Sequence, residues 1–315
     1  MTFEQPTNRL VEIAGDCTSG HADTLTPLIE TIRTRHGPTV RAIVYYGSCF
    51  RDGDPYDGLI DFYVVVTHYR RAHRRPVSAL ANRLVPPNVY YLERDGAAGR
   101  LRCKYAVIRL SDLEHGVTRG RLSSLWGRFA QPMAIVYSDT PSSHTSLRAC
   151  CGQAVVTLLE QSLPVLTAPM APADVFGTAL TLSYGGELRT ESGRRGHELA
   201  QKDREEYARR VHAARFALDL ATQLRPDGRL DWHASANRRK YAERRWRLRG
   251  PMGRSVSVLR LAKACFTFEN AVDYGAWKLE RHTGVTIEIT PRLRRYPLIY
   301  AWPVLWRLYR QGVLR

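Results

Sequence analysis

The sequence predicts an α+β protein: a mixed β-sheet with helices on it, then a mainly helical part, then a basic and aromatic carboxyl-terminal tail. Three observations lead to this prediction. Apolar runs rich in β-branched residues alternate with helical periodicity up to residue 140, helical periodicity dominates 141–255, and arginines are mixed with Tyr and Trp after residue 291. We therefore expect three parts, 1–140, 141–255 and 256–315, with a winged-helix-like arrangement as one option for the helical part.

The first 140 residues contain the expected sheet. Gly37-Pro38 ends a helix whose apolar residues recur at helical spacing, and Pro86-Pro87 ends another because proline has no backbone N–H to donate. Periodicity predicts helices at 24–35, 77–84 and 111–128. The β-branched and aromatic runs predict strands at 40–46, 59–66, 88–92, 101–110 and 132–137. The result is a sheet of four or five strands.

Helices are expected to dominate after residue 140. Periodicity predicts them at 149–163, 174–182 and 255–282, with a turn at 184–186. The segment 190–254 is highly charged and low in strand formers, and helices can be placed in it only loosely. The apolar positions of the last helix are expected to lie in the core: Leu259, Ala262, Phe266, Phe268 and Trp277.

Composition sets limits on compartment and class. The chain has 315 residues, and its six cysteines include no C-x-x-C pair. No secretory segment opens it, so we expect a reducing, cytoplasmic environment. No stretch reaches the ~18 consecutive apolar residues of a spanning helix. We therefore expect a protein that is soluble or lies on a membrane surface, without a transmembrane helix.

The net charge of +17 and the pI near 10.0 predict an acidic partner, and both nucleic acid and anionic lipid qualify. The basic runs at 70–75 and 238–247 resemble solvated helix faces. The segment 292–310 differs, because arginines mixed with interfacial aromatics are typical of the headgroup layer of a bilayer. Membrane contact at the inner face of the cell membrane is therefore expected, and the alternative is a tail that packs on its own protein.

A Gly-Ser pair and an aspartate mark the candidate catalytic centre. Gly47 and Ser48 follow a strand, and Asp61 lies thirteen positions after Ser48 on the next strand. Glycine allows backbone N–H groups to approach a triphosphate closely, and the second strand would bring Asp61 to the Mg²⁺ that accompanies it. This pattern is typical of nucleotidyltransferases. The alternative is an ordinary turn beside an edge carboxylate.

Three blocks together resemble the mitochondrial-type phosphatidate cytidylyltransferase family, also called the mitochondrial translocator assembly and maintenance protein family, in a bacterial-like form. The blocks occur in the family's order and cover roughly residues 40–190, with a weaker echo at 268–274. They are Tyr46–Ser48 with Leu59–Phe62, Lys104–Ile108 with Leu125–Pro132, and Leu182–Arg189. The resemblance implies a nucleotidyltransferase fold in 1–140 and a helical part that completes the active site.

The resemblance also implies an activity. Such an enzyme joins CTP and phosphatidic acid, with Mg²⁺, to give CDP-diacylglycerol and pyrophosphate for phospholipid and cardiolipin biosynthesis. By resemblance, Gly47 and Ser48 hold the CTP phosphates, Asp61 is a metal ligand, and Lys104 contacts a phosphate. Arg128 matches the arginine of the family's Gly-Arg segment. Tyr184 and Arg189 match its Ser-Tyr-x-Gly-Asp-x-Arg motif, with Glu187 in place of the Asp.

Two departures from the family bear on the site. Cys49 stands where the family has a second glycine and is expected to crowd the phosphate turn. The strand of Asp61 carries no second carboxylate, although a two-metal mechanism needs one. Asp57 and Glu187 are the first candidates for that ligand, ahead of Asp52.

Two other functions remain open from the sequence. A nucleotidyltransferase that acts on nucleic acid or protein fits the net charge, but nucleic acid is disfavoured because no RNA-binding motif is present. A non-catalytic nucleotide-binding module fits the single strand carboxylate.

Overall fold

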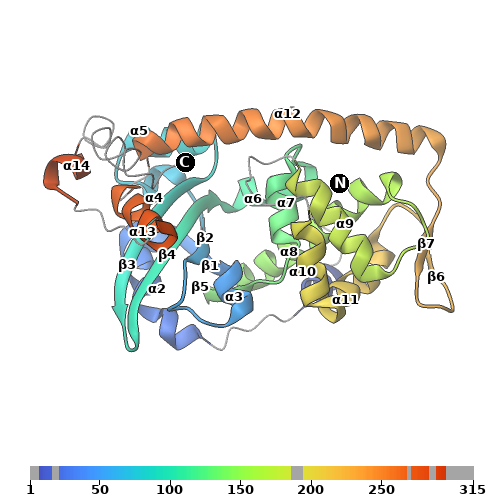
Figure 1. Cartoon of the computed structure of the whole chain (residues 1–315), viewed down its shortest axis with the longest axis horizontal. Helices are drawn as coiled ribbons and strands as arrows, with labels where there is room; N and C mark the ends of the chain where they lie inside the picture. The colour runs from blue at the N-terminus through green and yellow to red at the C-terminus, as the bar shows by residue number, and fades with distance from the viewer. Residues whose placement is uncertain (1–6, 16–20, 186–193, 268–270, 284–288, 296–315) are drawn as a thin grey trace.

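In the computed structural model of the chain, a five-stranded sheet and a body of helices lie side by side, and one long helix extends along both (Figure 1). The structure describes residues 7–15, 21–185, 194–267, 271–283 and 289–295. No helix among these residues has the length and apolar composition needed to cross a bilayer.

The sheet is mixed, which confirms the predicted α+β class. Its strands are β1 (Val40–Tyr46), β2 (Ile60–Val66), β3 (Asn88–Gly96), β4 (Gly99–Arg109) and β5 (Ala134–Ser138). They lie in the order β3-β4-β2-β1-β5, and only the β2–β4 pair is parallel. The central strand β2 and its neighbour β4 are separated in sequence by helices and β3, so residues far apart in the chain become neighbours.

One face of the sheet is covered by α2 (Ala22–His36), whose Leu25, Leu28 and Ile32 are fully buried. The turn between β1 and β2 contains α3 (Ser48–Asp52). Two short helices, α4 (Tyr69–Ala72) and α5 (Pro76–Leu84), connect β2 to β3. Short 3-10 turns lie at Gly37–Thr39, Leu163–Val165 and Arg215–Ala217.

The opposite face of the sheet packs on the helical body in one continuous apolar core. The body contains α1 (Thr7–Ala14), α6 (Leu110–Arg119), α7 (Ser123–Phe129), α8 (Pro141–Ser162), α9 (Pro172–Tyr184), α10 (Arg195–Lys202) and α11 (Arg204–Ala214). A two-stranded hairpin, β6 (Thr222–Leu224) and β7 (Leu230–Trp232), follows these helices. Although α1 precedes the sheet in the chain, it packs against α8.

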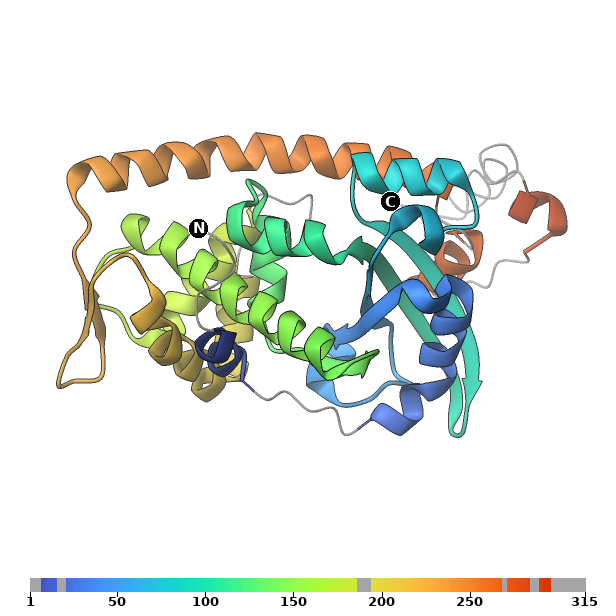
Figure 2. The same cartoon turned by 180° about the vertical axis from the view of Figure 1, so that it is seen from behind.

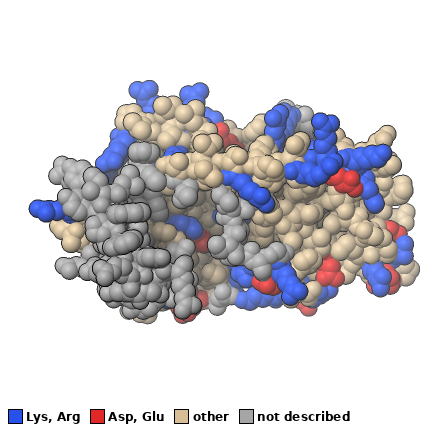
Figure 3. Space-filling model, turned by 45° about the horizontal axis from the view of Figure 1, so that its top comes forward, with Lys and Arg blue, Asp and Glu red and all other residues tan. Residues whose placement is uncertain are grey.

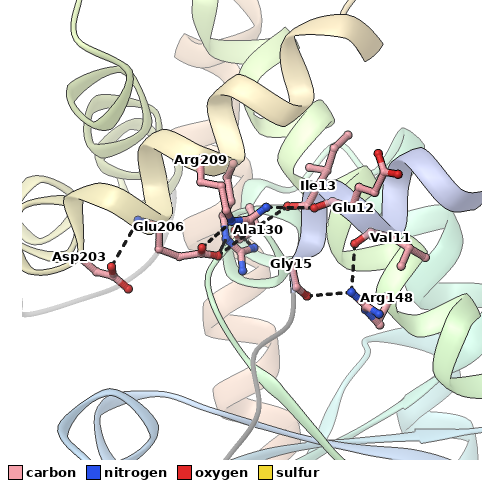
Figure 4. Close-up of polar contacts among 10 residues, drawn as sticks. Val11, Glu12, Ile13, Gly15, Ala130, Arg148, Asp203, Glu206 and Arg209 are labelled. Atoms are coloured by element: carbon pink, nitrogen blue, oxygen red, sulfur yellow. Dashed lines mark hydrogen bonds and ion pairs between the residues drawn. The ribbon is translucent and has the colours of Figure 1, made fainter. Parts of the chain in front are cut away.

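Arginines hold α1 against the helical body (Figure 4). The guanidinium of Arg209 donates to the carbonyls of Glu12 and Ile13, at 3.0 and 3.3 Å. These carbonyls lie in the last turn of α1, where the C=O groups of a helix have no N–H donors within the helix. Arg210, only 1% exposed, donates to Glu206 and to the carbonyl of Ala130. Charged side chains from α11 therefore satisfy the end of α1 and the loop after α7.

The long helix α12 (Ala236–Thr267) contacts both the sheet and the helical body, along which it extends in Figure 1. In its first half, Trp246 and Arg249 donate to the carbonyl and the side chain of Gln161, which lies at the end of α8. In its second half, Arg260 and Lys263 donate to backbone carbonyls of 85–87, between α5 and β3. It is followed by α13 (Ala271–Thr283) and α14 (Pro291–Arg295).

Two predictions about local structure are wrong. The helix predicted at 111–128 is two helices, because α6 ends at Arg119 and α7 begins at Ser123. At Gly120, between them, a Cβ would lie 2.2 Å from the carbonyl oxygen of Gly116. The segment 190–254, where the sequence places helices only loosely, contains α10, α11, the start of α12 and also the β6–β7 hairpin, whose Pro-Asp-Gly turn at 226–228 is a typical turn sequence.

The expected helix at 255–282 is instead the end of α12 followed by α13. Leu259 and Ala262 are exposed rather than buried, because this part of α12 turns Arg260 and Lys263 toward the protein. Trp277 is partly buried, beside Tyr274. The side chain of Phe266, residue Phe268 and the tail beyond Arg295 lie outside what the structure describes.

Candidate active site

Three polar side chains form a row across the sheet, on the face that meets the helical body. Tyr46 of β1 is paired with Asp61 of β2, and Asp61 is paired with Lys104 of β4. Because residues directly opposite each other in neighbouring strands point to the same face, the three side chains lie side by side. The Lys104 ammonium lies 3.1 Å from Asp61 Oδ1, and both side chains keep partial exposure, at 34% and 20%.

The Gly-Ser turn lies directly against this row. Gly47 has φ +96° and ψ −164°, a conformation that is essentially restricted to glycine. A Cβ at this position would lie 2.8 Å from Asp61 Oδ2, so the backbone of Gly47 and the carboxylate are in close contact. Ser48 begins α3 and is exposed. The structure thus brings Gly47, Ser48, Asp61 and Lys104 together.

Cys49 is expected from the sequence to crowd the turn, but its side chain points away from it. Its buried Sγ donates to the carbonyl of Leu59 at 3.3 Å, under the loop that leads to β2. A Cβ at Gly58 would lie 2.9 Å from this sulfur, so the thiol fills the space beneath that glycine. The side chain at position 49 therefore supports the loop and leaves the Gly47-Ser48 backbone accessible.

Arg128 joins the row through an aromatic stack. Its guanidinium carbon lies 5.8 Å from the ring centre of Tyr46, which stacks on Tyr63 at 5.0 Å. Burial raises the pKa of the Tyr46 phenol well above its usual value, with the charge of Asp61 acting in the same direction and that of Arg128 opposing it. Tyr46 is therefore a neutral platform between a carboxylate and a guanidinium.

The third sequence block packs beside Arg128. Ser123, at the start of α7, donates to the carbonyl of Ser183 at 2.8 Å. A Cβ at Gly127 would lie 2.5 Å from Ser183 Oγ, so α7 and the end of α9 are in close contact. Tyr184 is the last residue of α9 and follows this contact directly. Glu187 and Arg189 lie outside the described residues.

A cavity of about 570 Å³ opens from the row toward α12. Tyr46, Tyr63 and Lys104 of the sheet form its floor, and Arg128 lies on its wall. Five of its lining residues are cationic, against one carboxylate from Asp112. The cationic residues are Lys104, Arg121, Arg128, Arg260 and Lys263. Apolar residues of β3, β4, α7 and the loop before α7 line much of the remainder: Val89, Ala106, Ile108, Leu122 and Leu125.

The two cations from α12 are positioned by backbone carbonyls. Lys263 Nζ donates to the carbonyls of Val85 and Pro87, and Arg260 Nε donates to that of Pro86 at 3.0 Å. Burial lowers the pKa of Lys263 to about 8, and the neighbouring charge of Arg260 adds to this effect. An anion in the cavity would restore the charged form of Lys263, so this side of the cavity favours anionic ligands.

Of the predicted metal ligands that the structure describes, Asp61 lies in the row and Asp57 does not. Asp57 is 80% exposed and pairs with Arg281 at 3.3 Å rather than with the row. Within the described ranges, no group of three or more His, Cys, Asp or Glu residues could hold a metal ion. Asp61 fits a Mg²⁺ that is held mainly by phosphate oxygens and water, since such ions take only one or two protein carboxylates.

Arg121, Arg260 and Lys263 are cavity residues that the sequence analysis did not identify. Their signal in the sequence is weak: a cationic pair at i and i+3 marks one helix face, but the sequence does not show where that face docks.

Comparison with known proteins adds no assignment. The chain matches no known protein family, and a search of curated proteins finds no significantly similar sequence.

Proposed function

We propose that this protein is a Mg²⁺-dependent nucleotidyltransferase that joins CTP and phosphatidic acid to give CDP-diacylglycerol and pyrophosphate. One observation carries the proposal. The glycine-serine turn, Asp61 and Lys104 meet at the edge of a cationic cavity, which is the constellation that transfer between two phosphorylated substrates requires. The choice of CTP and of phosphatidic acid rests on the family resemblance of the three sequence blocks.

The triphosphate of CTP binds at the Gly47-Ser48 turn. The first N–H groups of a helix have no acceptors within the helix, and those at the start of α3 are available to phosphate oxygens together with the Ser48 hydroxyl. Lys104 contacts a phosphate from β4, and Arg128 does so from α7. By resemblance, Tyr184, the last residue of α9, and Arg189 also belong to the site, which the helical part completes.

Asp61 holds the Mg²⁺, and Asp57 and Glu187 remain the candidates for a second carboxylate ligand. When bound, the ion neutralises charge on the triphosphate. A phosphate oxygen of phosphatidic acid forms a bond to the α-phosphorus of CTP, and the bond from that phosphorus to pyrophosphate breaks. This oxygen is already ionised at neutral pH, so no side chain has to remove a proton.

The cationic cavity holds the acceptor phosphate. Lys104 and Arg128 lie between the two substrates and offset the repulsion between two polyanions, while Arg260 and Lys263 hold the far side of the acceptor. The apolar residues of the cavity wall suit the part of a lipid closest to its phosphate. The cavity thus accounts for a strongly basic protein with an anionic substrate.

The remaining parts of the proposal concern architecture and location. The sheet with α3 is a nucleotidyltransferase domain, and the helical body with the β6–β7 hairpin is a winged-helix-like unit. The protein works in the cytoplasm on the inner face of the cell membrane, and the tail 292–315 contacts anionic lipid.

Labelled CTP, phosphatidic acid and Mg²⁺ test the function directly. Asp61→Asn keeps the shape of the side chain and removes its charge, so turnover should fall by at least ~10²-fold. Asp95→Asn is the matched control, since Asp95 is 83% exposed on β3 and pairs only weakly with Arg100 at 3.2 Å. Turnover near that of the unaltered protein in a folded Asp61→Asn variant would remove Asp61 from the site.

The same assay tests the base. CTP should be used in preference to ATP, GTP and UTP, and equal incorporation from labelled CTP and ATP would show that the resemblance does not extend to nucleotide choice.

A second function is favoured by the net charge of +17. A nucleotidyltransferase for nucleic acid or protein would use the same row of residues with a different acceptor. Incorporation of label into RNA or protein, but not into phosphatidic acid, would select it. Tight CTP binding without transfer to any acceptor would indicate a nucleotide-binding module.

A further inference from the structure

Helix α5 presents its apolar side chains to the outside. Val77, Leu80 and Leu84 are 70%, 58% and 70% exposed, and they lie on one face because their spacing follows the helical repeat. The opposite face buries Ser78, Ala79 and Asn82. The helix is thus inverted relative to an ordinary surface helix, which turns its apolar stripe toward the core.

The inverted orientation of α5 is specified by polar contacts on its inner face. Asn82 Nδ2 donates to the carbonyl of Val107, and Asn82 Oδ1 accepts from the backbone N–H of Asn88. Asn88 Nδ2 in turn donates to the carbonyl of Ser78. Because both asparagines are buried, turning the helix to bury its leucines would break these hydrogen bonds in the interior. The apolar face is therefore held outward.

Helix α12 adds further apolar residues beside α5. The two helices are in contact, and Figure 2 shows α5 alongside the end of α12. On this part of α12, Val258 and Leu259 are 55% and 54% exposed. We call the exposed apolar residues of both helices, Val77, Leu80, Leu84, Val258 and Leu259, the α5–α12 patch. A concentration of large exposed apolar side chains marks an interaction surface.

Arginines surround this patch. The arginines in and before α5 are all exposed, and none of them forms an ion pair with a carboxylate among the described residues: Arg70, Arg71, Arg74, Arg75 and Arg83. The chain has no Asp or Glu at all in 67–92 or in 244–268. Figure 3 shows Lys and Arg side chains projecting from the upper part of the molecule, with fewer acidic side chains among them.

The patch adjoins residues that line the cavity. Residues 85–87 continue directly from α5, and Pro86 and Pro87 line the cavity. From α12, Ser257 lines the cavity beside the exposed Val258. A surface docked on the patch would therefore lie close to residues that line the cavity.

We propose that the α5–α12 patch docks on an anionic lipid bilayer. Exposed leucines and valines enter the boundary between headgroups and acyl chains, while the arginines pair with anionic headgroups. Nucleic acid would use the arginines but leave the apolar side chains in water, so it fits the surface less well. The patch itself rests on exposure and charge, whereas its role in delivering lipid to the cavity rests on the proposed function.

Sedimentation of the full chain with vesicles tests the proposal. The vesicles contain phosphatidylcholine with phosphatidylserine, and vesicles of phosphatidylcholine alone serve as the neutral comparison. The double variant Leu80→Ser/Leu84→Ser should bind the anionic vesicles at least ~tenfold more weakly, because it removes two side chains that would enter the bilayer. Phe216→Ser is the matched control, since Phe216 is 64% exposed on the helical body and should change binding less than ~twofold.

The charged part of the patch has its own variants. Arg74→Gln and Arg75→Gln should each weaken binding to the anionic vesicles about fivefold and leave the weak binding to neutral vesicles unchanged. Higher salt should reduce the difference between the unaltered protein and these variants. Retention of thermal stability by all variants, which change exposed positions, shows that any lost binding is not lost folding.

Two results would overturn the proposal. In one, Leu80→Ser/Leu84→Ser binds anionic vesicles as well as the Phe216→Ser control does, whereas Trp302→Ser/Trp306→Ser in the tail abolishes binding. In the other, the Arg74 and Arg75 variants lose affinity for single-stranded DNA while vesicle binding is unchanged. Failure of the proposed function is distinguishable, because vesicle sedimentation needs no CTP and no turnover.

Discussion

Replacing Gly47 by alanine tests the contact between the turn and the carboxylate, without removing any polar group from the site. The new Cβ would lie 2.8 Å from Asp61 Oδ2 and 3.2 Å from Asp61 Cβ, where ordinary contacts begin near 3.4 Å. The carboxylate oxygen must therefore move by 3.4 − 2.8 = 0.6 Å. Because the Asp61 Cβ is also too close, rotation of the carboxylate alone does not relieve the contact.

Two consequences follow from Gly47→Ala. Alanine in this backbone conformation costs about 1–3 kcal/mol of stability. The displacement of Asp61 stretches its pairing with Lys104 and misplaces the metal ligand, so turnover should fall by ~10- to 10²-fold, the usual effect of misplacing a catalytic group by less than about 1 Å.

Gly37→Ala separates these two consequences. Gly37 has φ +63° and ψ −154°, close to the conformation of Gly47, but a Cβ there meets no heavy atom within 4 Å. It should lose similar stability in urea unfolding and keep turnover within ~twofold. If Gly47→Ala transfers label from CTP as fast as Gly37→Ala under conditions where both are folded, the close approach of Gly47 to Asp61 has no part in catalysis.

Three other predictions concern buried basic side chains. Burial lowers the pKa of His73 to about 4 from its ordinary 6.5. Its contribution to stability is therefore complete above pH 6.5 and is lost as the pH falls toward 4, by up to about 3 kcal/mol. Urea unfolding from pH 7 to pH 4.5 should show this loss of stability, and His73→Gln should show a smaller loss. The pKa of Lys263 is lowered to about 8, so anion affinity in the cavity should decrease as the pH rises through 8. Lys263→Arg should remove this pH dependence from KM, because arginine stays charged. An identical pH profile of KM in the unaltered protein and in the variant would contradict this prediction. Arg210→Met leaves the half-buried Glu206 without its most buried partner and should destabilise the fold by about 3–5 kcal/mol. Arg209→Met changes a side chain that is 39% exposed and should cost about 1 kcal/mol. Equal melting temperatures for the two variants would show that burial of the pair does not matter.

Local sequence determined the elements of the site. The nearly continuous apolar runs of β1 and β2 predicted both strands, because burial of both faces of an interior strand requires such a run. Glycine at position 47 predicted a backbone conformation that other residues avoid, and its φ of +96° agrees. These features depend on a few neighbouring residues, so the sequence alone suffices to identify them.

Tertiary structure decided which distant residues complete the site. Lys104 lies beside Asp61 because β2 and β4 pair in parallel, a register that no local pattern encodes. Arg260 and Lys263 reach the cavity because α12 docks one narrow face on 85–87, and the same docking leaves Leu259 exposed where helical periodicity alone had predicted core. Apolar spacing along a helix reports that a face exists, but the neighbours that cover that face, or leave it open, come from other parts of the chain.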